Sequence, residues 1–286
     1  VCDEAQRIKN PAAMVTRAAK KQRVDFKVAC TGTPVENTLA DLWCLFDLIQ
    51  PGLLGALNDF GQRYRKPIEA RDDEERARIE ELHTRIAPQI LRRTKAEVAR
   101  DLPPKIIVED CRRLRLSTAQ RNVYAKAIED FKQRNDPAAT SPFKNHLGLL
   151  QYLRLVCTDP RRYGLTAFNP EPVAEYRAKA PKLDWLLAQL ECIHATGEKA
   201  IVFCEFRNIQ RLLQYYIEQA LKVRVDIING TTSAAANHTS SRQKRIKVFQ
   251  EAPGFGVIIL SPVAVGFGVN IQAANHVIHY TRTWNP

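Results

Sequence analysis

Short apolar runs in the last third of the chain alternate with longer stretches whose apolar residues recur at helical spacing. The periodic stretches predict helices over residues 182–197, 209–217 and 240–250. The runs predict strands over residues 200–204, 223–228, 257–260 and 276–280. Strands that alternate with helices build a parallel sheet covered by helices. We therefore expect an α/β fold whose ligands gather at the carboxyl ends of the strands.

The first two thirds of the chain show mainly helical periodicity. Helices are predicted over residues 36–50, 72–87, from Ser117 onward and over about 143–157. Ser117 is followed three residues later by Gln120, which is a capping-box pattern. Buried strands are expected over residues 26–31 and 106–111, and the Pro- and Ala-rich residues 164–181 are expected to be extended or mobile.

Length and composition are those of a globular protein of about two domains, because 286 residues carry 45% apolar and 26% charged residues. Pro103-Pro104 indicates a hinge or domain boundary, since neither residue donates a backbone hydrogen bond. The longest apolar runs, such as 257–260, are far shorter than the ~18 to 20 residues of a membrane span. We therefore expect no membrane partner. The chain also lacks an initiator Met and a visible leader, which favours a cut or engineered fragment.

Basic residues outnumber acidic residues by 43 to 31, which gives a net charge of +12. A balance of this size favours a polyanionic partner such as nucleic acid, because neutralised phosphates release condensed counterions. General solubility charge is the alternative interpretation. The basic residues gather at Arg92-Arg93 with Lys95, at Arg112-Arg113 with Arg115, at Arg161-Arg162 and over residues 242–247.

The seven cysteines form no C-x-x-C pair, and several lie inside apolar runs. Buried free thiols in a reducing compartment fit this pattern better than a zinc site. His276 and His279 are three residues apart on a predicted strand, so they face opposite sides and cannot share a metal.

Asp3 and Glu4 are the strongest candidates for chemistry, because the Thr31-Gly32-Thr33-Pro34 turn follows them at the end of a predicted strand. In phosphoryl-transfer motors a strand-end Asp holds Mg²⁺ and a neighbouring carboxylate orients the attacking water. A surface acidic pair that opens a helix is the plainer alternative. Thr31 and Thr33 would couple a nucleotide site to movement, or would simply cap a strand-to-helix connection.

Three further candidates follow predicted strands near the C-terminus. Gly266 and Gly268 would let the backbone approach a phosphate closely, and Asn270 would bond base, ribose or phosphate. Residues 229–232, with Gly230 and Thr231, would suit a nucleic-acid phosphate. Trp284 would stack on or wedge into nucleic acid. Plain turns, and a Trp that covers the sheet, are the alternatives.

These segments, taken together and in order, resemble the helicase-like ATPases of the SWI/SNF type within helicase superfamily 2. The matching stretches span essentially the whole chain and are residues 3–11, 31–37, 42–47, 51–55, 90–95, 102–105, 152–160, 199–206, 266–270 and 284–286. Stretch 90–95 reads Ile-Leu-Arg-Arg-Thr-Lys and contains Arg92 and Arg93. Gln6 stands where many members have His, and the Gln variant is typical of bacterial relatives.

The resemblance implies two RecA-like lobes with helical protrusions that use ATP and Mg²⁺ to translocate on double-stranded DNA and displace bound proteins. Residues 1–105 would be the C-terminal part of lobe 1 with a helical protrusion. Residues 106–181 would be a helical protrusion and linker, and residues 182–286 would be lobe 2. A bacterial relative of this kind would work in the cytoplasm or nucleoid.

The resemblance also implies a role for each matching residue. Asp3 would help to hold Mg²⁺, and Glu4 would orient the attacking water. Asp3, Gln6, Gly266 and Gly268 would line the nucleotide site, while Thr31 and Thr33 would couple it to movement. The nucleic-acid contacts would be Gly230, Thr231, Asn270, Trp284, Arg92 and Arg93.

Two elements of the family's pattern are absent from these 286 residues. No G-x-G-K-[ST] precedes Asp3, and no Gln-x-x-x-Arg-x-x-Arg segment follows Pro286. Arginine fingers contribute ~10³ to 10⁵ in rate in related motors. We therefore expect a truncated fragment that does not hydrolyse ATP by itself, although its parent protein does.

Residues 1–35 pose a folding problem, because an isolated pair of strands has bare edges. We expect them to be tethered by the helix at 36–50 or to exchange strands with a neighbouring molecule. Two other functional classes stay open for the chain. One is a non-catalytic nucleic-acid-binding module, and the other is an RNA helicase of the same superfamily.

Overall fold

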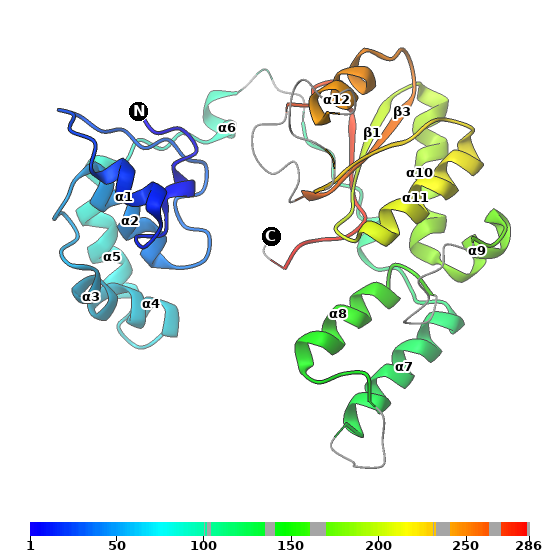
Figure 1. The fold of residues 1–286 in the computed structure, drawn as a ribbon, viewed down its shortest axis with the longest axis horizontal. Coiled ribbons are helices and arrows are strands. Elements are labelled where there is room, and N and C mark those ends of the chain that lie inside the picture. Colours follow the sequence, from blue (N-terminus) through cyan, green and yellow to red (C-terminus); the bar gives the residue numbers. More distant parts are fainter. Residues whose placement is uncertain are drawn as a thin grey trace. The chain divides into compact units, whose positions relative to one another are not determined.

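The computed structural model describes residues 1–99, 101, 104–134, 141–160, 170–230, 232, 241–262 and 270–284, without the side chains of Lys95, Ala96 and Arg112. These residues form two compact units, Val1–Lys105 and Ile106–Pro286 (Figure 1). No helix in the described ranges is long and apolar enough to cross a membrane.

The first unit is built from helices packed around α2. Its elements are η1 (Ala5–Ile8), α1 (Met14–Lys20), α2 (Leu39–Ile49), α3 (Leu57–Phe60), η2 (Gly61–Arg65), α4 (Lys66–Ala70), α5 (Glu75–Ile86), η3 (Ala87–Gln89) and α6 (Lys95–Val98). Phe46 of α2 packs with Phe60, Tyr64 and Leu82 in one buried cluster. The helix predicted over residues 36–50 is present as α2, which begins at Leu39, and Gly52, with a φ of 86°, follows its end.

The predicted buried strand at 26–31 is wrong. A single parallel bridge joins Cys2 to Ala29, and the ring of Phe26 is 82% exposed. Among the described residues nothing apolar covers this ring, so the run of apolar residues does not become a buried strand. In α5, which lies within the helix predicted over residues 72–87, Leu82 and Ile86 are buried, whereas Ile79 is exposed.

Helix α2 holds the N-terminal segment against the rest of the first unit. Leu45 and Leu48 of α2 form a buried cluster with Ala5 and Ile8 of η1. The Cys44 thiol donates to the Ile8 carbonyl at 3.1 Å. The structure therefore contains the tether that was expected for residues 1–35.

The second unit contains a helical hairpin and a sheet with its covering helices. Its helices are η4 (Asp110–Arg112), α7 (Thr118–Lys132), α8 (His146–Val156), α9 (Val173–Lys179), α10 (Pro181–Thr196), α11 (Arg207–Leu221) and α12 (Arg242–Glu251). Helices α7 and α8 pack through Ala127, Phe131, Leu149, Leu153 and Val156. The capping box at the start of α7 is confirmed, because Ser117 and Gln120 bond each other's backbone amides.

Within the described residues, four parallel strands confirm the predicted α/β fold. They are β1 (Lys199–Phe203), β2 (Asp226–Ile228), β3 (Gly256–Leu260) and β4 (His276–His279), in the order β2-β3-β1-β4. In register, Ala200 of β1 lies opposite Val257 of β3 and His276 of β4. Side chains alternate between the two faces, so Val202 packs with residues of α10 and α11 while Ile201 packs with residues of α12.

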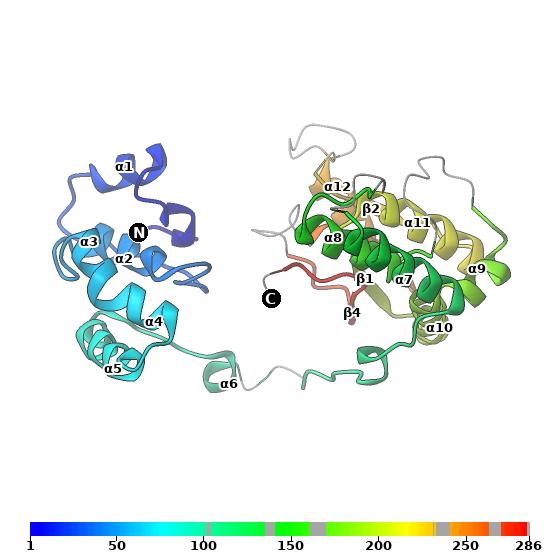
Figure 2. The ribbon, with the colours of Figure 1, turned by 90° about the horizontal axis from the view of Figure 1, so that it is seen from below.

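Two predictions for residues 104–181 need correction. The expected strand at 106–111 is absent from the described residues, where Ile106 is 85% exposed in coil and η4 follows. No described strand pairs with it, because the sheet is made by later residues. The stretch 164–181 contains α9, whose Tyr176 is buried and stacks on Tyr216 at 4.6 Å. Figure 2 shows α7 and α8 side by side and α9 near α10.

Candidate functional site

The acidic pair Asp3-Glu4 lies in a tight turn directly after the Cys2 bridge. Glu4 has a φ of 49°, in the left-handed region, and precedes η1. The Asp3 carboxylate accepts the Glu4 amide at 2.9 Å, which holds this turn. A residue other than Gly in this region carries strain of about 1 to 2 kcal/mol. Such strain is concentrated at functional sites, where the surrounding contacts maintain it.

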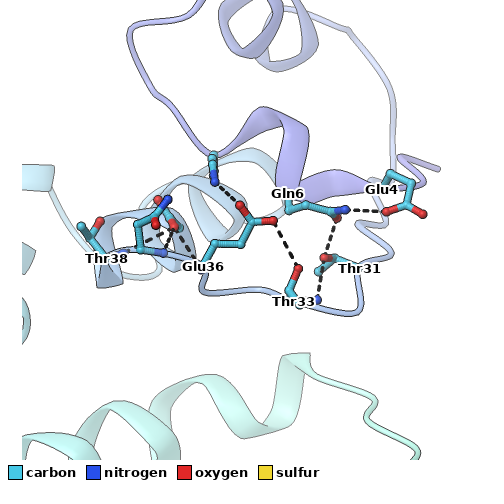
Figure 3. A network of polar contacts seen from close by, with 9 residues as sticks. Glu4, Gln6, Thr31, Thr33, Glu36 and Thr38 are labelled. Carbon is cyan, nitrogen blue, oxygen red and sulfur yellow. Dashed lines mark hydrogen bonds and ion pairs between the residues drawn. The ribbon is translucent and has the colours of Figure 1, made fainter. Parts of the chain in front are cut away.

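The buried amide of Gln6 joins the acidic pair to the Thr31 turn (Figure 3). Its Nε2 donates to the Glu4 carboxylate at 2.5 Å, and its Oε1 accepts the Thr31 hydroxyl at 2.7 Å. The Thr31 Oγ1 in turn accepts the Thr33 amide at 3.1 Å. Gln6 therefore fixes the carboxylate and the turn relative to each other, although they are 27 residues apart.

The same network continues to the start of α2. The Thr33 hydroxyl donates to the Glu36 carboxylate at 3.5 Å, and Lys9 forms an ion pair with Glu36. The Asp41 carboxylate accepts the amides of Glu36 and Asn37 at 3.1 and 3.0 Å. Sequence reasoning missed Glu36 and Asp41. The acidic residue three positions after Thr38, at a helix start, was the available signal.

This arrangement presents oxygen atoms, which suit a hard cation. Mg²⁺ is bound in phosphoryl-transfer sites by one or two carboxylates, with waters and substrate phosphates completing the shell. Asp3 is exposed and supplies one such carboxylate. Within the described residues no group of three His, Cys, Asp or Glu side chains could hold a metal alone.

In the second unit, the loop after β2 is held by a buried side chain. The Asn229 Nδ2 donates to the Gln210 Oε1 at 2.8 Å, and the Gln210 Nε2 donates to the Cys204 carbonyl at 2.7 Å. A Cβ at Gly230 would lie 3.2 Å from the Arg207 guanidinium, so glycine permits this close approach. Arg207 was missed by sequence reasoning, because only the fold brings α11 to this loop.

Trp284 follows β4 and is 56% exposed. The Arg154 guanidinium of α8 lies over its ring at 4.5 Å and donates to the Arg282 carbonyl and, at 2.8 Å, to the Glu205 carboxylate. Arg154 and Glu205 had no predicted role. They are distant from Trp284 in sequence, so no local pattern pairs them.

The other predicted site residues are spread over both units. Asn270 is exposed, and Arg92 and Arg93 are exposed in coil before α6. Thr231, Gly266 and Gly268 lie outside the described residues. The structure thus brings together Glu4, Gln6, Thr31 and Thr33 in one network. In the second unit, Gly230 follows β2 and Trp284 follows β4.

Comparison with protein families gives two matches along the chain. Residues 1–162 match the SNF2-related domain, and residues 181–286 match the helicase conserved C-terminal domain.

Several curated proteins are similar over the whole chain. The Zorya protein ZorD of Escherichia coli O139:H28 is 54% identical over 289 residues, which cover 100% of this chain and 26% of that protein. The "putative ATP-dependent helicase/translocase YwqA" of Bacillus subtilis is 34% identical and is matched over 99% of this chain and 30% of its own length. The chain thus spans less than a third of either relative.

Solved structures were also compared. The SWI2/SNF2 ATPase core of Sulfolobus solfataricus, in a complex with dsDNA, is 29% identical with a TM-score of 0.48. The match covers 98% of this chain and 57% of that one.

Proposed function

Because the chain belongs to the SNF2-related family of helicase-like ATPases, we propose that it forms part of a motor that uses ATP and Mg²⁺ to translocate on double-stranded DNA. Residues 1–105 would belong to its first RecA-like lobe, residues 106–181 to a helical protrusion and linker, and residues 182–286 to its second lobe. DNA-bound proteins would be displaced by this movement.

The observation that carries the proposal is the polar network from Glu4 through Gln6 and Thr31 to Thr33 and Glu36. In a motor, the carboxylate that orients the attacking water has to be coupled physically to the segments that move during hydrolysis. Gln6 provides this link, since it contacts both the Glu4 carboxylate and the Thr31 hydroxyl. A surface acidic pair at a helix start would not require a buried amide between it and a distant turn.

Each carboxylate has a distinct role in the proposal. Asp3 would hold the Mg²⁺ that neutralises developing charge on the phosphates of ATP. Glu4 would orient the attacking water and accept its proton, and the Gln6 amide would keep the Glu4 carboxylate in place. Gly266 and Gly268 would complete the nucleotide site.

The nucleic-acid contacts in the proposal come from both units. Gly230 and Thr231 would offer backbone amides to a DNA phosphate, and Arg207, beside Gly230, would add a charge. Asn270 and Trp284 would approach the groove. Arg92 and Arg93 would neutralise phosphates of the backbone and so make binding salt-dependent.

The test is ATP hydrolysis by the whole protein that contains this chain, with and without duplex DNA. We expect duplex DNA to stimulate hydrolysis. Glu4→Gln should lower the rate at least about 100-fold while ATP still binds, because a positioned base contributes about 10² to 10⁴. Glu80→Gln, which changes an exposed carboxylate of α5, is the matched control.

Two results would contradict the proposal. Hydrolysis that duplex DNA leaves unchanged would exclude a double-stranded-DNA motor, and stimulation by RNA instead would favour an RNA helicase. DNA binding without any hydrolysis, in wild type and Glu4→Gln alike, would favour a non-catalytic binding module.

A further inference from the structure

The second unit has an open pocket of about 290 Å³ between the α7–α8 hairpin and the carboxyl ends of β1 and β4. Its lining includes three cationic side chains, those of Arg154, Lys182 and Arg282. It also includes Trp284 and the hydroxyl-bearing Thr281, but no Asp or Glu. Cationic side chains that lie close together repel one another, so an anionic ligand in this pocket would relieve the repulsion and bind favourably.

Lys182 has hydrogen-bonding capacity to spare. Its ammonium donates to the Tyr280 carbonyl at 3.1 Å and lies 5.4 Å from the centre of the Tyr280 ring. Within the described part of the chain it forms no ion pair. An ammonium has three N–H donors. Burial lowers the pKa of Lys182; Cys157 and Cys204 partly oppose this effect, and the charges of Arg154 and Arg282 add a smaller lowering.

Arg282 is the second available cation. Its side chain is exposed and has no ion pair among the residues that the structure describes. Its backbone is fixed, however, because its carbonyl accepts a hydrogen bond from Arg154. The guanidinium of Arg282 can therefore reach a ligand without losing a protein partner.

Arg154 has the opposite character, because its donors are already engaged. It donates to the Gln151 Oε1 at 3.1 Å and to the Glu205 carboxylate at 2.8 Å, besides the Arg282 carbonyl. Its guanidinium also lies over the rings of Trp284 and Phe206, at 4.5 and 5.5 Å. Arg154 thus orients Arg282 and Trp284 and is a positioning residue.

We propose that this pocket binds a backbone phosphate of DNA, with Lys182 and Arg282 as the ligands of the phosphate and Arg154 as the residue that positions Arg282 and Trp284. The exposed ring of Trp284 at the pocket edge favours nucleic acid over an acidic peptide, because a sugar or base can pack on it. The net charge of +12 favours the same partner. The inference rests on the proposed function, to which it adds two phosphate ligands.

The test measures binding of the 286-residue chain to a fluorescent 20-base-pair duplex over a range of KCl concentrations. Each phosphate contact contributes about 0.9 to the slope of log K against log salt. We expect Arg282→Gln and Lys182→Met each to weaken binding and together to reduce the slope by about 1. Lys222→Gln is the matched control, because it removes one exposed charge at the C-terminal end of α11, outside the pocket lining. It should leave the slope unchanged.

A second measurement separates the pocket from DNA binding as a whole. Inorganic pyrophosphate should change the fluorescence of Trp284 in the wild-type chain, and the change should be lost in Trp284→Phe and in the Lys182→Met/Arg282→Gln variant. Arg154→Lys should keep the charge but weaken the response, because it loses the contacts that orient Arg282. Thermal unfolding of each variant verifies that it is folded. Because Arg282 is exposed, Arg282→Gln still tests the pocket even if Lys182→Met unfolds.

The outcomes distinguish the two proposals. An unchanged salt slope in the double variant, with normal DNA binding, overturns the pocket alone. A pyrophosphate response in a chain that does not bind duplex DNA overturns DNA as the ligand and reassigns the pocket to a small phosphate ligand, while the proposed function still depends on the whole protein's ATP hydrolysis. Binding of an acidic peptide that depends on Lys182 and Arg282, without any effect on DNA, overturns the choice of ligand.

Discussion

Gln6 shows how much of this site depends on one uncharged side chain. It is 5% exposed, and its two amide atoms bond the Glu4 carboxylate and the Thr31 hydroxyl. An amide offers a donor and an acceptor at once, whereas a carboxylate offers only acceptors. Gln is therefore suited to join an acid to a hydroxyl in a buried position.

Loss of the Thr31 hydroxyl should reveal the strength of this link. Thr31→Val leaves the buried Gln6 Oε1 without its donor, so we expect a loss of about 1 to 3 kcal/mol in the free energy of unfolding. Urea unfolding of the chain measures it. Thr33→Val is the control, because Thr33 is exposed and its hydroxyl bond is 3.5 Å long. Equal losses in the two variants would contradict a special role for Gln6.

Glu81 of α5 should respond strongly to pH. The Tyr64 hydroxyl donates to it at 2.7 Å and lowers the pKa of Glu81 to about 2, with help from Arg63 and Arg78. Because the pKa of Glu81 is lower in the folded protein than in the unfolded chain, its ionised carboxylate stabilises the fold at pH values above the ordinary pKa of Glu. This stability is lost as the pH falls from about 4.5 toward 2.

Tyr64→Phe removes the leading cause of that shift. We expect the pKa of Glu81 to rise, and the acid limb of the stability curve to move to higher pH. NMR titration of the Glu81 carboxyl measures the first, and urea unfolding at several pH values measures the second. An unchanged pKa in Tyr64→Phe would show that the arginines alone set it.

The order of Asp3-Glu4 and the Thr31 turn along the chain marks both as candidates, and the structure brings Glu4 and Thr31 into one network, while their role stays a prediction. The contacts of Gln6, Glu36 and Arg154 could not be predicted from the sequence. Each depends on a partner brought near by folding, such as Arg154 with Glu205, which is 51 residues away. Periodicity reports which face is buried, not which distant group a polar side chain meets.

At the scale of elements, α2 is the helix that the first unit depends on. Its apolar residues serve two clusters, since Phe46 packs with Phe60 while Leu45 and Leu48 pack with Ala5 and Ile8. Helical periodicity predicted α2 well because its apolar residues are buried. The strand expected at 26–31 is reduced to one bridge with Cys2, and the strand expected at 106–111 has no described partner, because apolar content alone does not supply a pairing strand.

Leu48→Ala should therefore release the N-terminal segment selectively. Leu48 is 2% exposed, and its truncation should cost about 2 to 5 kcal/mol. Amide hydrogen exchange should accelerate at Ala5 and Cys30, whose amides take part in pairing the segment. Leu82→Ala in the other cluster is the matched control. If it exposes the same amides to the same extent, α2 is no special tether.

At the scale of the whole molecule, the two units have separate cores, and Ile106 just after their boundary is exposed. Limited digestion with trypsin should cut at Lys105, which is exposed. The fragment from Ile106 onward should keep its parallel sheet, because all four strands and their covering helices lie within it. Circular dichroism and thermal unfolding of the purified fragment measure this. A fragment that loses cooperative unfolding would show that the units depend on each other.

The strand order β2-β3-β1-β4 has a consequence for how the protein is synthesised. β1 is translated first but ends in the interior of the sheet, between β3 and β4. Its neighbour β3 begins 57 residues after Lys199, so both edges of β1 stay unpaired until the ribosome has synthesised β3 and β4. Non-local pairing of this kind slows folding and exposes strand edges. The nascent chain should therefore need protection at the edges of β1, because α10 and α11, which flank it in sequence, cover only one of its faces.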